Sequence, residues 1–335
     1  MEGDDVTYLE AARTVDERAH SDDATAAFRA ALREADHAGD GDTDDGDRGD
    51  ESDGTDGTGV RVLEAGAGTC GMLRRLLADD VLPAGEWVAV DTDERVLSTA
   101  HDRLRADALD AGYAVERGDA DGNRVGNGGS YRDSDGDSSG YRDSDAIELR
   151  RPGCARSLRV RFAVADARAV AAEGGFDGVV ARSFADLLAP EDVLALLRSA
   201  APDGWYHLPL TFDGETRFAP DHPADDAVVD AFHATMRNRG RAATRLADRF
   251  TEAGTPPTVD ARSDWTVEGN EAGTYRADEA TFLRTILDTV VASVRASERV
   301  PAATLADWAE TREEQLGRGS LRYVARNRDL FGRVP

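Results

Sequence analysis

A hydrophobic strand, a glycine-rich turn and a helix follow one another at residues 60–77, and this feature constrains the fold most. The apolar run 60–63 leads into Gly66, Gly68 and Gly71, after which residues 72–77 have a helical apolar pattern. Glycine tolerates the positive φ angles of a tight turn and lets a ligand approach the backbone closely. The pattern therefore predicts an α/β sheet with a nucleotide-like ligand at the end of its first strand.

The same alternation of strand and helix patterns continues along the chain. Further strands are predicted at 87–90, 158–165, 176–181 and 205–212, and helices at 94–109 and 190–200. Residues 8–36 indicate two helices broken near residues 20–23. The last third indicates helices at 225–239, 242–253, 277–296 and 301–316, with strands at 258–267 and 321–330. Short apolar strands alternating with helices predict a doubly wound, mostly parallel α/β sheet with a helical C-terminal elaboration.

Two acidic segments lack any apolar periodicity. Residues 37–59 hold nine acids and one arginine, and residues 118–145 hold seven acids and three arginines. We expect a disordered linker and a disordered insert, because such segments bury too little apolar surface to fold. The predicted domains are an N-terminal helical cap at 1–36, the linker, a ligand-binding core at 60–215 that contains the insert, and a substrate region of C-terminal helices and last strands at 216–335.

The net charge of −26 arises from 66 acids and 40 bases, and all of the bases are arginine. Such a chain repels nucleic acid and anionic membranes at ordinary salt. The composition also resembles the proteins of extreme halophiles, whose cytoplasm holds so much salt that charge repulsion hardly extends beyond the surface.

The two cysteines and six scattered histidines show no metal-ligand spacing, so we expect no metal site. No apolar run is long enough to span a membrane, and the acidic start is unlike a signal peptide, so we expect a cytoplasmic protein.

The glycines at 66–71 have two interpretations. They spell G-x-G-x-x-G, and Asp91 follows the last glycine by twenty residues, as in dinucleotide-binding sites of NAD-dependent dehydrogenases. Glu64 argues against a dinucleotide, because a carboxylate at the end of the strand would repel a pyrophosphate. S-adenosylmethionine has no phosphate and presents an ammonium and a sulfonium, both of which a carboxylate attracts.

Four stretches in order resemble motifs of the class I S-adenosylmethionine-dependent methyltransferases, in a haloarchaeal type. They are the acid-x-G-x-G pattern from Glu64, the stretch 88–93, the stretch 162–167 and the stretch 176–181. The sequence departs from the first motif at Cys70, where the family has a third glycine. The resemblance implies a seven-stranded Rossmann-like sheet and S-adenosylmethionine as the cofactor. The cofactor-binding residues that it implies are Glu64, Gly66, Ala67, Gly68, Asp91, Thr92, Asp166, Ala167 and Ala181.

In the family, Asp91 would bind the ribose diol and Asp166 the adenine amino group. Taken alone, either aspartate also fits a helix N-cap, the common role of aspartate after a strand. Arg18, in the first helices, is predicted either to meet the cofactor carboxylate or to remain solvated. Trp265, in the C-terminal third, either lines an acceptor pocket or packs helices against the sheet.

The catalytic residues are not identified by the sequence. Arg182 is a candidate for binding a substrate carboxylate, or pairs with a neighbouring aspartate, and His207 is a candidate base or a structural residue. Residues 181–184 read Ala-Arg-Ser-Phe and lack the Asn/Asp-Pro-Pro-aromatic motif of enzymes that methylate exocyclic amines. We therefore expect a small-molecule acceptor and no nucleic-acid partner. A non-catalytic cofactor-binding scaffold is the further alternative.

Overall fold

The computed structural model describes residues 6–38, 59–117 and 146–335. Its centre is a sheet of five parallel strands in the order β5-β2-β1-β6-β7. Their bounds are Ser157–Val164, Gly85–Asp91, Val60–Ala65, Gly178–Val180 and Trp205–Ala219. These strands are mostly apolar because helices cover both faces of the sheet. Since β1 has β2 on one side and β6 on the other, the strand order reverses beside β1, where α/β sheets bind ligands.

Antiparallel strands extend this parallel centre at both edges. On one side β3 (Ala114–Arg117) and β4 (Ile147–Arg150) continue from β5. On the other side β10 (Arg322–Arg333) runs antiparallel to β7, and it also pairs with β8 (Val259–Arg262) and β9 (Trp265–Glu268). The sheet of described strands therefore has ten members, and a strand antiparallel to its neighbours follows the five parallel ones.

Two groups of helices cover the parallel strands. One face carries α2 (Asp22–Ala38), α3 (Gly71–Ala78) and α4 (Glu94–Asp110), which bury Phe28, Leu73 and Leu104 against the sheet. The other face carries α5 (Ala167–Ala171), α6 (Pro190–Ala200) and α8 (Ala242–Glu252). Each group forms its own apolar core with one face of the sheet.

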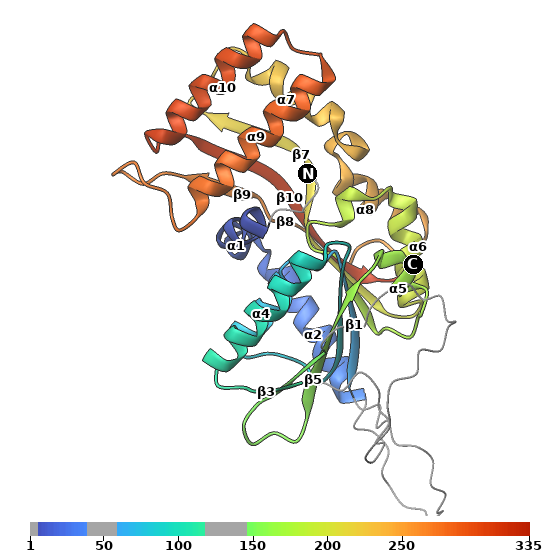
Figure 1. Cartoon of the computed structure of the whole chain (residues 1–335). Helices are drawn as coiled ribbons and strands as arrows, with labels where there is room; N and C mark the ends of the chain where they lie inside the picture. Colours follow the sequence, from blue (N-terminus) through green and yellow to red (C-terminus); the bar gives the residue numbers. More distant parts are fainter. Residues whose placement is uncertain (1–5, 39–58, 118–145) are drawn as a thin grey trace, which may run out of the picture.

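A third apolar core lies beyond the parallel strands. It contains α1 (Val6–Ala19), α7 (Asp225–Thr235), α9 (Glu279–Ser297) and α10 (Ala302–Gly317), packed on the far parts of β7 and β10 and on β9. Figure 1 shows α7, α9 and α10 gathered there, away from α2 and α4. Because β7 and β10 are long, one sheet connects the parallel strands to this C-terminal unit. Two short 3₁₀ helices, η1 (Ala185–Leu187) and η2 (Arg237–Gly240), contact one another where the two parts meet.

The predicted fold class, a doubly wound sheet with a mostly parallel centre, is confirmed, but its strand number is wrong. The sheet has ten strands rather than seven, because β3 and β4 add an antiparallel edge and the predicted strand 258–267 is two strands, β8 and β9. The predicted boundary at residue 215 falls inside β7. The insert at 118–145 and nearly all of the linker at 37–59 lie outside the described residues. Within the described ranges, no helix combines the length and apolarity needed to cross a membrane.

Candidate cofactor and acceptor cavity

The glycine turn between β1 and α3 forms one wall of a cavity of about 310 Å³ at the C-terminal ends of the parallel strands. Gly66 has φ +65° and Gly68 has φ +54°, angles that L side chains rarely adopt. A Cβ atom at Gly66 would lie 2.2 Å from Cδ2 of Phe184. Cys70, which replaces the third glycine of the family motif, also has a left-handed φ of 54°. The turn therefore keeps the glycine-type backbone at that position with a cysteine side chain.

Asp91, at the end of β2, joins the turn to the second strand. Its Oδ2 accepts a hydrogen bond from the backbone N–H of Gly68 at 3.0 Å, and its Oδ1 accepts from the N–H of Asp93 at 3.1 Å. Burial raises the pKa of Asp91, and these backbone donors oppose the rise. Asp93, and not Asp91, is the N-cap of α4. The carboxylate of Asp91 thus lines the cavity with room for further donors.

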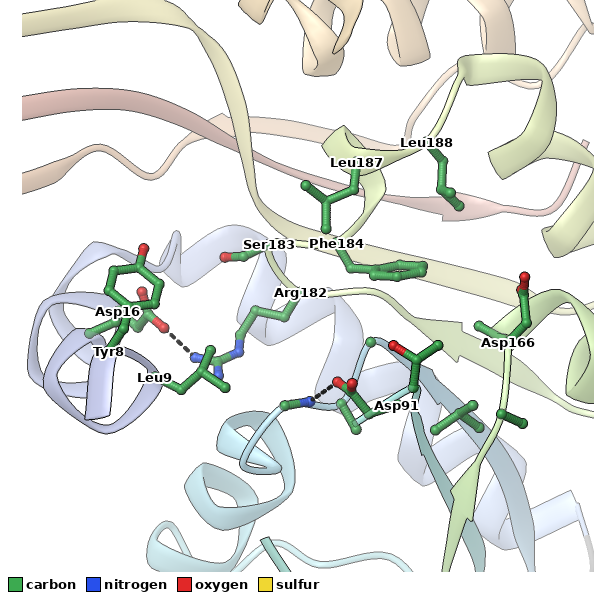
Figure 2. Close-up of a pocket in the computed structure, with 18 of the residues that line it drawn as sticks. Tyr8, Leu9, Asp16, Asp91, Asp166, Arg182, Ser183, Phe184, Leu187 and Leu188 are labelled. Atoms are coloured by element: carbon green, nitrogen blue, oxygen red, sulfur yellow. Dashed lines mark hydrogen bonds and ion pairs between the residues drawn. The ribbon is translucent and has the colours of Figure 1, made fainter. Parts of the chain in front are cut away.

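Asp166 lies at the far end of the cavity, after β5 (Figure 2). It is the N-cap of α5, where its Oδ1 accepts from the backbone N–H of Arg168. The Arg168 guanidinium also pairs with the same carboxylate, 2.6 Å from Nη2 to Oδ2, and lowers its pKa. The N-cap alternative for Asp166 is therefore observed, and a ligand at this carboxylate would have to share it with Arg168.

Glu64 does not line the cavity. Its side chain is buried and its Oε2 accepts a hydrogen bond from Nε1 of Trp87 at 2.8 Å. Burial raises the pKa of Glu64 to about 7, while the Trp87 donor and Arg182 lower it. The direct contact with a cationic ligand that the sequence predicts for Glu64 is not available, because the side chain points into the core behind the glycine turn.

The opposite wall comes from segments far apart in the sequence. Asp16 of α1 pairs with Arg182, which follows β6, at 2.5 Å between Oδ2 and Nη1. Figure 2 shows this pair beside Tyr8 and Leu9 at one end of the cavity, with Asp91 between it and Asp166. The Arg182 guanidinium also lies against the turn, so that a Cβ atom at Gly71 would be 2.2 Å from its Nη2. Arg182 thus takes the second of its two predicted roles, a pair with an aspartate.

Three polar atoms in this wall are buried and have no hydrogen-bond partner among the described residues: Oδ1 of Asp16, Nε1 of Trp265 and Oγ of Ser183. The Trp265 indole lies close enough to the Asp16 carboxylate to lower its pKa, so these two groups face one another. Asp16 is only 5% exposed, and burial raises the pKa of its carboxyl group although Arg182 opposes the rise. Ser183 has a left-handed φ of 48°. Buried polar atoms are normally satisfied, so the Ser183 hydroxyl leaves hydrogen-bonding capacity in the lining of the cavity.

The structure brings together most of the cofactor residues that the sequence predicts. Gly66, Ala67, Gly68, Asp91, Thr92, Asp166 and Ala167 all line the cavity. Ala181 does not; it is buried behind the wall that Arg182, Ser183 and Phe184 form. Trp265 of β9 lines the cavity and also packs on Phe282 of α9, with 5.4 Å between the ring centroids, so both of its interpretations describe its position.

His207 and Arg18 lie away from the cavity. The His207 ring is buried on the α2 side of the sheet with its centroid 4.6 Å from that of Phe28, and burial lowers its pKa to about 3. Side chains of a strand alternate between the two faces of the sheet, and the His207 side chain lies on the face that α2 covers, away from the cavity. Arg18 forms an ion pair with Glu279 of α9, 2.5 Å between Nη1 and Oε1. Neither predicted role of Arg18, a contact with the cofactor carboxylate or a purely solvated side chain, is therefore observed.

Other lining residues had no signal in the sequence. Leu9 and Ala12 belong to an amphipathic helix whose pattern gives no partner, and Leu187 and Leu188 follow a strand end without any motif. Leu187, Leu188 and Phe184 lie on the side of the cavity opposite Asp91 (Figure 2). Among the described residues, no group of three His, Cys, Asp or Glu side chains is arranged to hold a metal ion.

No protein-family model and no curated protein matches the sequence. Solved structures are similar in fold at low identity. The cyclopropane synthase MmaA2 from Mycobacterium tuberculosis has a TM-score of 0.36 and 11% identity, covering 82% of this chain and 78% of that one. Phosphoethanolamine N-methyltransferase 2 from Haemonchus contortus, solved with S-adenosylhomocysteine, has a TM-score of 0.37 and 12% identity, covering 82% of this chain and 49% of that one. Magnesium protoporphyrin IX methyltransferase from Synechocystis has a TM-score of 0.33 and 14% identity, covering 61% of this chain and 68% of that one.

Proposed function

We propose that this protein is an S-adenosylmethionine-dependent methyltransferase that acts on a small-molecule acceptor. The observation that carries the proposal is the charge of the cavity. Its described lining includes three acids, Asp16, Asp91 and Asp166, and two arginines, each already paired with one of those acids. The cavity therefore has an excess of carboxylate, which suits a cationic ligand and opposes a pyrophosphate.

The lining fits the parts of S-adenosylmethionine in order. Asp91 has acceptor capacity left for a ribose diol, and Asp166 and Ala167 lie at the far end for an adenine. At the other end, the Asp16 carboxylate would accept from the α-ammonium, and Arg182 would bind the α-carboxylate. When bound, the cofactor supplies an activated methyl group on a sulfonium. The role of the chain is then to position the two reactants, which by itself lowers a barrier by up to about 7–11 kcal/mol.

The sheet favours this function over an NAD-dependent dehydrogenase. A dinucleotide-binding sheet continues with parallel strands in the order 3-2-1-4-5-6. Here β10 follows β7 and is antiparallel to it, so the sheet departs from that all-parallel order. The acidic, lysine-free composition further supports our proposal of a halophilic cytoplasmic enzyme that does not act on nucleic acid.

Calorimetric titration of the full chain in molar KCl with S-adenosylhomocysteine, S-adenosylmethionine and NAD tests the proposal. We expect S-adenosylhomocysteine and S-adenosylmethionine to bind, and we expect the titration with NAD to show no heat of binding. Binding of NAD alone would overturn it. If the cofactor binds but no methyl group leaves it across a broad panel of metabolites, the non-catalytic scaffold is the better description.

A further inference from the structure

Four exposed arginines lie within residues 237–245, which comprise η2, Arg241 and the first turn of α8. Arg237, Arg239, Arg241 and Arg245 make no ion pair among the described residues. Elsewhere arginines are commonly paired, as Arg328 is with Asp213 and Asp260. We call residues 237–245 the arginine loop. In a chain with a net charge of −26, such an unpaired basic segment is a local exception that needs an explanation.

The arginine loop lies at the rim of the cavity. Its first part, η2, contacts η1, and Nδ2 of Asn238 donates a hydrogen bond to the carbonyl oxygen of Leu188 at 2.9 Å. Leu188 lines the cavity on the side opposite Asp91 (Figure 2). Two of the four arginines flank Asn238 directly in sequence. A ligand that enters the cavity past Leu187 and Leu188 therefore passes beside this loop.

The backbone of the loop is strained where it meets the rim. Asn238 has φ 59° and Arg239 has φ 49°, left-handed angles in two consecutive residues that are not glycine. Strain of this kind persists where the surrounding structure fixes it, and it gathers at ligand-binding positions. Here the Asn238 hydrogen bond and the packing of Gly240 on Phe212 hold the loop against β7.

Asp213, which lies beside Arg241, does not neutralise these arginines. Asp213 forms a backbone bridge with Arg241, but its carboxylate accepts from Thr244 and from Arg328 instead. Four like charges so close in sequence repel one another, and the repulsion falls when an anion binds between them. Arginine guanidinium groups bind phosphate and carboxylate oxygens through paired hydrogen bonds.

We propose that the arginine loop binds an anionic group of the methyl acceptor, so that the acceptor is a small molecule with a phosphate or carboxylate. This proposal rests on the proposed methyltransferase function. The anionic group lies outside, at Arg237, Arg239 and Arg241, while the rest of the acceptor enters the cavity between Leu187 and Ser183. The unpartnered Oγ of Ser183 then offers the inner part of the acceptor a hydrogen bond.

The test is calorimetric titration of the full chain with inorganic phosphate and, separately, with succinate, at one fixed KCl concentration. The test variant carries Arg237→Gln, Arg239→Gln and Arg241→Gln. The control variant carries Arg284→Gln, Arg295→Gln and Arg299→Gln, which remove three exposed charges without an ion pair among the described residues from α9 and the turn after it. We expect at least one of the two anions to bind, at least tenfold more weakly in the test variant and within twofold of the original chain in the control.

The two anions separate the two acceptor classes, since phosphate binding alone indicates a phosphorylated acceptor and succinate binding alone a carboxylate one. The proposal is overturned if neither anion binds, if anion binding survives in the test variant, or if the control variant loses as much. Titration of all three proteins with S-adenosylhomocysteine keeps the two proposals apart. Its affinity should be the same in all three, and its failure to bind the original chain would refute the methyltransferase function while leaving the anion site to be judged on its own titrations.

Discussion

The two walls of the cavity are built in different ways. The wall beside β1 and β2 is made of one glycine turn and the strand end that follows it, held by the Asp91 hydrogen bond to Gly68. The opposite wall combines α1, the segment after β6 and β9, held by the Asp16–Arg182 pair across 166 positions of sequence. The first wall is fixed by backbone conformation, and the second by an ion pair between separate elements.

This difference suggests different sensitivities to mutation. Backbone at positive φ that is packed against a neighbour tolerates no side chain, so a side chain added at Gly66 in the first wall should abolish the site. In the second wall a carboxylate and a guanidinium meet a ligand directly, so changes there should weaken only the part of the ligand that they touch.

Gly66→Val should weaken S-adenosylhomocysteine binding most. A β-branched residue at φ +65° is strained, and its Cβ would lie 2.2 Å from Phe184. Left-handed backbone costs about 1–2 kcal/mol and overpacking about 1–3 kcal/mol, so we expect a loss of affinity on the order of a thousandfold, ~4 kcal/mol. Gly112→Val is the matched control for calorimetry, because Gly112 has φ +82° but open space around its Cβ position. An equal loss in both variants would show that strain alone, and not the packing on Phe184, is responsible.

Glu64→Gln should change the pH dependence of stability. The folded chain holds the Glu64 proton up to a pH of about 7, whereas the ordinary value is 4.5. The stabilisation from protonated Glu64 is complete below pH 4.5 and is lost as the pH rises to about 7. The difference in free energy of unfolding between the variant and the original chain should therefore change by about 3 kcal/mol between pH 4 and pH 8, in favour of the variant. Chemical denaturation at both pH values measures it, with the exposed Glu94→Gln as control; parallel curves for Glu64→Gln would contradict the raised pKa.

Asp91→Ala should weaken cofactor binding at least tenfold, ~1.4 kcal/mol, because it removes the acceptors for the ribose and the link to Gly68. Asp93→Ala is the matched control, since Asp93 caps α4 two residues away and does not line the cavity. Calorimetry with S-adenosylhomocysteine measures both. Unchanged affinity in Asp91→Ala would remove Asp91 from the proposed site.

Asp16→Asn should weaken binding of S-adenosylhomocysteine about tenfold, ~1.4 kcal/mol, and leave that of 5′-methylthioadenosine within twofold. The second nucleoside lacks the amino-acid group that Asp16 and Arg182 are proposed to hold. The exposed Asp23→Asn serves as control. An equal loss for both ligands would mean that Asp16 acts by holding α1 in place and not by binding the ammonium.

His207→Leu should have the smallest effect. Both ring nitrogens of His207 are buried without hydrogen-bond partners, and the ring lies away from the cavity. Replacing such a group by an apolar one of similar size is close to neutral for stability. We expect cofactor affinity and any methyl-transfer rate to stay within twofold. A large loss of rate with unchanged affinity would return His207 to the catalytic candidates.

Much of the fold was predictable because its signals are local. The helix predicted at 190–200 is α6 to the residue, and the predicted break in the N-terminal helices near residues 20–23 is the junction of α1 and α2. The sequence predicts neither the short edge strands β3 and β4 nor the five-residue α5, because β3 has mostly exposed, polar residues and α5 is too short to show a period. It predicts one strand in place of β8 and β9, since the break at Ser263–Asp264 interrupts the pairing with β10 and not the residue pattern.

The sequence by itself determined the glycine turn, the acids at the ends of β2 and β5 and the alternation of strands and helices around them. Each of these depends on φ angles and side-chain periods that neighbouring residues set. Only the tertiary structure decided that Glu64 faces Trp87, that His207 faces Phe28, that Asp16 meets Arg182 and that the arginine loop lies on the rim at Leu188. The physical reason is that these relations join elements distant in the chain, so they depend on how the helices pack on the sheet and not on any local pattern.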